Sequence, residues 1–211
     1  MEALRRYFSP DCGNAFANAL PELRQRIASI QFCPHGSDFG VSGNTFRAYV
    51  RWPEPPSIVY REWAQGICTE LNIETLEQKL GTADGFNVWH TALAGSLQEH
   101  WVHRQGRELS FAHTYKLIDL FIKWLSMRDF KSLQFSQCLV SYANCALDSQ
   151  TLSKLNECLS MALPLSKPSM GDIHSMRTYE FCQALIEAFA SHYGGTRLLF
   201  DYFAWRRGGG N

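Results

Sequence analysis

Residues 110–125 read Ser110-Phe-Ala-His-Thr-Tyr-Lys-Leu-Ile-Asp-Leu-Phe-Ile-Lys-Trp-Leu125. Apolar side chains recur here at helical spacing, which predicts an amphipathic helix with one broad face in a hydrophobic core. Ser110 has the side chain expected of an N-cap residue. Lys116 falls at the edge of the apolar stripe, about 40° from Leu120 on the helical wheel. We therefore expect Lys116 to lie at the border between the core and the surface.

Helical patterns also occupy most of the remaining chain, and no repeat, heptad run or low-complexity linker interrupts them. Pro21 is expected in the first turn of the first helix, where proline is tolerated. About seven helices with little strand predict an irregular all-α domain rather than a four-helix bundle. Residues 1–30 are expected to begin the chain as helix, with residues 18–27 the most helix-friendly part. Further helical stretches are expected at residues 57–71, 72–80, 86–104, 110–127, 134–146, 149–163 and 174–192.

Residues 31–56 differ from the remainder because they contain three glycines and four prolines. These residues break long helices, so we expect an irregular segment that lies over one face of the domain. In residues 45–52, apolar and polar side chains alternate enough to suggest a short strand or an extended arm within this irregular segment. The chain is thus predicted to be one domain. Residues 1–56 would form a helix and this segment, and residues 57–211 a helical core.

Composition narrows the possible functions. The 211 residues are 45% hydrophobic, and 20 Lys and Arg balance 20 Asp and Glu. This neutral balance argues against a purely electrostatic nucleic-acid binder, although a local basic strip remains compatible with it. Seven cysteines without zinc spacing indicate free, mostly buried thiols and no metal site, as expected in a reducing cytosol. No apolar run is long enough for a membrane span.

A second informative segment is residues 142–155, where one helix is expected to end and another to begin just after Asp148. Asp148 is therefore a good N-cap, which is its structural interpretation. The amides and dipole of a helix start also stabilise negative charge. A fixed aspartate beside a pocket is what a reaction with a cationic transition state requires.

Together these segments resemble the helix-hairpin-helix DNA glycosylase superfamily. Lys116, Asp119 and Lys123 lie on an apolar helix, and Asp148 follows Lys116 by 32 residues at the start of another helix. This spacing is most similar to the archaeal branch that removes 8-oxoguanine. The resemblance implies that Lys116 is the nucleophile and Asp148 its partner. In that branch an aspartate and a tryptophan four residues apart hold the flipped base.

Asp201 and Trp205 lie four residues apart near the end of the chain, so the resemblance implies that they bind the flipped base. Trp89 and Leu120 are further candidates for the wall of the base pocket. The stretch between Met127 and Asp148 has no glycine and thus no Gly-x-Gly hairpin to grip a phosphate. Two cations of this stretch are candidates for phosphate contacts: Arg128 and Lys131.

The resemblance implies a monomer without a cofactor that acts on double-stranded DNA carrying a modified base. The base would be oxidised guanine or, since the usual hairpin is absent, a bulky viral base such as glucosylated hydroxymethylcytosine, as removed by anti-phage glycosylases. Lys116 would form a Schiff base, or Asp148 would activate water and leave an abasic site. The rival interpretation is a non-enzymatic helical module that binds a protein partner. A metal-dependent nuclease is disfavoured because carboxylates are not clustered.

Overall fold

The computed structural model describes residues 2–27, 30–47, 49, 51–164 and 167–206. It is mostly helical, which confirms the predicted all-α class, and it contains ten α-helices within these residues rather than about seven. The chain forms two compact units. Unit 1 comprises residues 1–27 and 140–211, and unit 2 comprises residues 28–139. The boundary suggested by the sequence at residue 56 lies inside unit 2.

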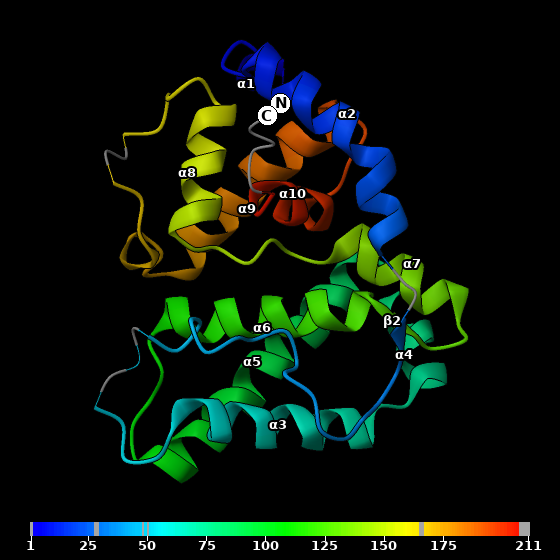
Figure 1. Cartoon of the computed structure of the whole chain (residues 1–211), viewed down its shortest axis with the longest axis vertical. Coiled ribbons are helices and arrows are strands. Elements are labelled where there is room, and N and C mark those ends of the chain that lie inside the picture. Colours follow the sequence, from blue (N-terminus) through cyan, green and yellow to red (C-terminus); the bar gives the residue numbers. More distant parts are fainter. Residues whose placement is uncertain (1, 28–29, 48, 50, 165–166, 207–211) are drawn as a thin grey trace. The chain divides into compact units, whose positions relative to one another are not determined.

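Unit 1 is built from two separate parts of the chain. Its helices are α1 (Glu2–Arg5), α2 (Pro10–Arg26), α8 (Ser149–Cys158), α9 (Met176–His192) and α10 (Arg197–Ala204), with a short 3-10 turn (Met170–Asp172) before α9. Helix α10 packs against α2, α8 and α9, and Figure 1 shows it (red) among them. The core is aromatic, because Phe16 is fully buried and its ring centroid lies 5.2 Å from that of Phe203 and 6.0 Å from that of Phe189.

Helix α2 begins at Pro10, inside the helical stretch expected for residues 1–30 but ahead of its most helix-friendly part at residues 18–27. Ser9 caps it by accepting a hydrogen bond from the backbone N–H of Cys12 at 3.3 Å, and Pro10 occupies the first turn. The prediction that Pro21 lies in the first turn is therefore wrong, because Pro21 lies inside the helix. The signal of the true start was the Ser9-Pro10 pair.

Unit 2 contains α3 (Pro56–Glu70), α4 (Ile73–Leu80), α5 (Ala83–Gln105), α6 (Phe111–Ser126) and most of α7 (Leu133–Tyr142). Helix α5 packs against α3, α4 and α6. A buried hydrogen bond of 2.8 Å joins His90 Nε2 of α5 to Asp119 Oδ1 of α6. Two short parallel strands, β1 (Ile30–Gln31) and β2 (Arg128–Asp129), were not predicted. A two-residue strand is too short to produce an alternating pattern.

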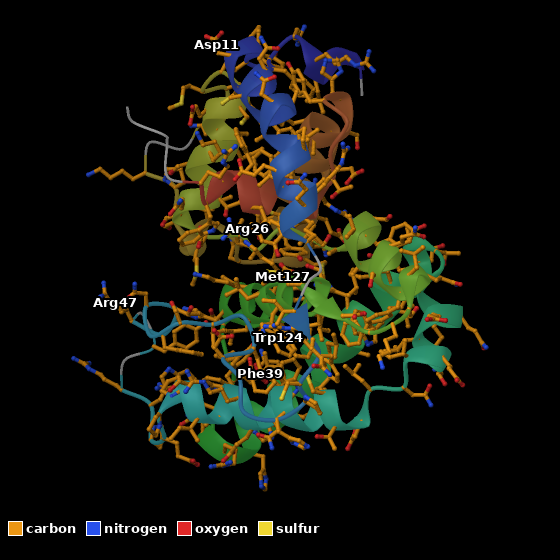
Figure 2. All side chains as sticks on the ribbon, turned by 45° about the vertical axis from the view of Figure 1, so that its right-hand side comes forward. Asp11, Arg26, Phe39, Arg47, Trp124 and Met127 are labelled. Carbon is orange, nitrogen blue, oxygen red and sulfur yellow. The ribbon has the colours of Figure 1, made fainter. Side chains whose placement is uncertain are left out.

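The described residues between 30 and 55, called the strap below, follow one face of α6. Phe39 packs on Trp124 with ring centroids 5.1 Å apart, and Figure 2 shows both side chains. Gly40 approaches the carbonyl of Leu120, and Tyr49 covers His113. The expected irregular segment over one face is thus confirmed. The described part of residues 45–52 forms turns and irregular backbone, so the short strand predicted there is not found.

All seven cysteines are free, and all except Cys33 are buried, in agreement with the sequence prediction. Within the described part of the chain, no helix combines the length and apolar character needed to cross a membrane.

Candidate functional site

Lys116 lies on α6, and its position at the edge of the buried face is confirmed. The helix starts at the N-cap Ser110, which accepts a hydrogen bond from the backbone N–H of His113. Most side chains of α6 are buried, but Lys116, Leu120 and Lys123 form a half-buried stripe at helical spacing. Leu120 therefore lies on the same half-buried stripe as Lys116, and its predicted role in the base pocket stays a prediction.

Trp89 has a different environment from Lys116, although both belong to unit 2. The half-buried Trp89 lines a groove of about 270 Å³ together with Ile67 of α3 and Leu76 of α4. The groove is bounded by α3, α4 and α5. Trp89 therefore faces α3 and α4 rather than the stripe that carries Lys116. This placement does not support its predicted role in the base pocket.

Arg128 and Lys131, the candidate phosphate contacts, also differ from one another. The guanidinium carbon of Arg128 lies 4.3 Å from the centroid of the Trp124 ring, and the residue is half-buried. Lys131 is exposed beside a hollow of about 420 Å³ that Phe32 and Phe130 also line. Its backbone N–H donates to Asp129 Oδ1 at 2.8 Å. Lys131 is thus the more accessible of the two to a DNA phosphate.

Asp148 belongs to unit 1 and caps α8, as its position in the sequence predicts. Its Oδ1 accepts hydrogen bonds from the backbone N–H groups of Gln150 and Thr151, each at 3.0 Å. The residue is only 6% exposed. These amides fix the position of the carboxylate. Asp148 therefore has a structural role that any test of catalysis must separate from the chemical one.

The segment that leads to Asp148 is held by two helices of unit 1. Ala146 donates its backbone N–H to Oδ2 of Asp201, on α10, at 2.7 Å. Gln183, on α9, accepts from the N–H of Cys145 at 3.0 Å and donates to its carbonyl at 2.7 Å. Sequence reasoning missed Gln183, because a single glutamine in a helix carries no signal of such a contact. The segment before Asp148 is thereby fixed without regular secondary structure.

Asp201 and Trp205 are exposed to very different degrees. Asp201 is fully buried, so its carboxylate faces the interior and supports the Asp148 segment. Contact between Asp201 and a base would require a change from this conformation. Trp205, the C-cap of α10, is 49% exposed, and aromatic side chains of this kind can stack on planar ligands. Next to it, the carbonyl of Ala204 accepts a hydrogen bond from Gln150 Nε2 at 2.9 Å.

The contact of Asp201 leads to a prediction about stability. Asp201→Ala should lower the free energy of unfolding by about 1–3 kcal/mol, because the buried N–H of Ala146 loses its acceptor. Urea unfolding measures this effect. Gln150→Ala is the matched control, since it removes a less buried bond to the same helix and should cost under about 1 kcal/mol. Equal stability of Asp201→Ala and the parent protein would contradict the supporting role.

Across the described residues, no group of three or more histidine, cysteine, aspartate or glutamate side chains is placed to hold a metal ion. No family model matches the chain, and no curated protein or solved structure is significantly similar to it.

Proposed function

We propose that this protein is a DNA N-glycosylase that flips out a modified base and cleaves its glycosidic bond. The observation that carries this proposal is the arrangement within unit 1. Two hydrogen bonds, from Ala146 to Asp201 and from Gln150 to Ala204, join the Asp148 segment to the middle and the end of α10. A fixed carboxylate and a half-exposed tryptophan, Trp205, thus come from neighbouring parts of one unit although the sequence separates them widely.

The proposed chemistry starts with extrusion of the base, because the reacting bond is inaccessible inside a duplex, at a cost of a few kcal/mol. Trp205 stacks on the extruded base, a contact worth about 1–3 kcal/mol. Cleavage leaves positive charge on the sugar, which the carboxylate of Asp148 stabilises. Lys116 then attacks C1′ to form a Schiff base. In the alternative route Asp148 activates water and an intact abasic site remains.

Contacts to DNA are proposed to be local rather than spread over a basic surface, because the chain has no net charge. Lys131 is exposed and supplies one of them. The substrate base in this proposal is bulky and virus-specific, such as glucosylated hydroxymethylcytosine, or else oxidised guanine. The protein would act as a monomer in the cytosol, in antiviral defence or in base-excision repair.

The test uses three duplexes of identical sequence that carry oxidised guanine, glucosylated hydroxymethylcytosine or only ordinary bases. After incubation, the small-molecule fraction is analysed by mass spectrometry for free base. Release from one modified duplex and not from the ordinary duplex supports the proposal. Absence of free base from both modified duplexes contradicts it, and then favours the non-enzymatic interaction module.

A further inference from the structure

A histidine next to Lys116 has features that the proposed chemistry does not yet use. His113 lies three residues before Lys116 on α6, and such residues are neighbours on a helix, with about 5–6 Å between their Cβ atoms. Its Nδ1 lies 2.8 Å from Oγ of Ser110, the N-cap. When Nδ1–H donates to this oxygen, the lone pair of the imidazole is on Nε2. Ser110 thus orients the ring, and the tautomer that can accept a proton on Nε2 is the one in which its oxygen accepts from Nδ1–H.

Nε2 of His113 is buried and, within the described protein, has no hydrogen-bond partner. The strap causes this burial, because the ring of Tyr49 lies 4.1 Å from the imidazole, centroid to centroid. A buried ring nitrogen without a hydrogen-bond partner costs free energy, so such a group calls for an explanation. A lysine ammonium that approaches from the next turn of the same helix face would provide the missing donor.

Among the described residues, the titratable neighbours of the His113 imidazole are Lys116 on its own helix and Tyr49 from the strap. Trp101 of α5 and Trp52 lie beyond Tyr49 and carry no charge, and the guanidinium of Arg107 lies over Trp52 at 3.8 Å. Burial lowers the pKa of His113 below 6.5, and the positive charge of Lys116 lowers it further. The imidazole is therefore neutral and able to accept a proton at neutral pH.

We propose that His113 is the proton acceptor for Lys116, with Ser110 orienting its imidazole and Tyr49 shielding it from water. This proposal rests on the proposed function, because it assigns a partner to the nucleophile. The ammonium of Lys116 gives one proton to Nε2, and the amine lone pair then forms the bond to the C1′ carbonyl carbon of an abasic sugar. When the carbinolamine collapses, the imidazolium returns the proton to the leaving hydroxyl. Water departs, and the protonated Schiff base remains.

The test measures the rate of adduct formation on a duplex with one abasic site, trapped by borohydride, between about pH 5 and pH 9. In the parent protein the proton stays within the protein, so the rate should be level around neutral pH. It should fall only at acidic pH, below 6.5, where His113 becomes protonated. In His113→Phe, which keeps a ring under Tyr49, the rate at neutral pH should drop at least about tenfold. It should then rise steadily with pH, because hydroxide must remove the proton.

His113→Ala provides a second variant, in which imidazole added to the buffer should restore much of the rate by occupying the vacated space. His103→Phe, an exposed histidine of α5, is the matched control and should keep the parent profile. Thermal unfolding of each variant verifies that it is folded. A purely structural role of His113 would change stability but would leave the pH profile unchanged and imidazole without effect.

The outcomes separate the two proposals. An adduct that depends on Lys116, with the same rate and pH profile in His113→Phe as in the parent protein, overturns the role of His113 alone. An adduct that does not depend on Lys116 overturns the assignment of the nucleophile and, with it, that of its proton acceptor. Three results together support His113 as the proton acceptor for Lys116. They are a lower rate in His113→Phe, a rate in that variant that rises with pH, and rescue of His113→Ala by imidazole.

Discussion

Lys116→Ala should abolish the borohydride-trapped adduct with abasic DNA, because a Schiff base needs a primary amine and alanine has none. Lys116→Arg should abolish it equally, although arginine keeps the positive charge and a long side chain. Loss in both variants would show that the amine, rather than the charge, is required. The measurement is the amount of protein that comigrates with labelled DNA on a denaturing gel after reduction.

Lysines on a protein surface can trap abasic DNA non-specifically, so this experiment requires a control. Lys79→Ala is suitable, since Lys79 is an exposed residue in the last turn of α4 and belongs to no part of the proposed site. It should leave the adduct at the level of the parent protein. An undiminished adduct in Lys116→Ala would mean that another amine reacts, and the assignment of the nucleophile would be wrong.

Gly40→Ala should strongly destabilise unit 2, by about 3 kcal/mol. Gly40 has a φ of +85°, which favours glycine, and a Cβ built there would lie 2.3 Å from the carbonyl oxygen of Leu120 and 3.0 Å from Cβ of Trp124. The left-handed backbone conformation alone costs a residue with a Cβ about 1–2 kcal/mol. The clash of the added Cβ with Leu120 forces the strap away from α6, because a backbone oxygen in the middle of a helix cannot move aside. Urea unfolding measures the total.

Two other glycines of the strap separate these effects. Gly36 also has a positive φ, +68°, but nothing lies within 4 Å of its added Cβ, so Gly36→Ala should show the backbone cost alone. Gly43 has open space and no positive φ, so Gly43→Ala should be neutral or slightly stabilising. If Gly40→Ala costs no more than Gly36→Ala, the close approach of the strap to α6 is not important for stability.

The sequence predicts helices well where local patterns determine them. The apolar period and Ser110 place α6 at residues 110–127, and the structure has Phe111–Ser126. Asp148 is a recognisable N-cap, and the structure confirms it. The predicted helix 149–163 ends early, at Cys158, and Ser160 and Met161 then adopt a positive φ that no glycine announces. A helix end formed by left-handed residues other than glycine is not visible in a local pattern.

Contacts between distant parts of the chain could not be predicted in the same way. The bond from Ala146 to Asp201 joins residues 55 apart, and the contact of Gly40 with Leu120 depends on the path of an irregular segment. Trp89 is an example from the candidate site of what the sequence could not predict. A tryptophan at the border of a buried helix face can line the surface on either side of that face. Its spacing in α5 does not tell which neighbour it meets, and the structure turns it toward α3 and α4.

The most direct test of the central claim is the rate of base release by Asp148→Asn under single-turnover conditions, measured together with its stability. Asparagine caps a helix as well as aspartate does, so the bonds to Gln150 and Thr151 can persist and unfolding should change by less than about 1 kcal/mol. Loss of the charge should nevertheless slow base release by about 100-fold or more. Unchanged release in a stable Asp148→Asn protein would contradict the account, because Asp148 would then be only the cap of α8.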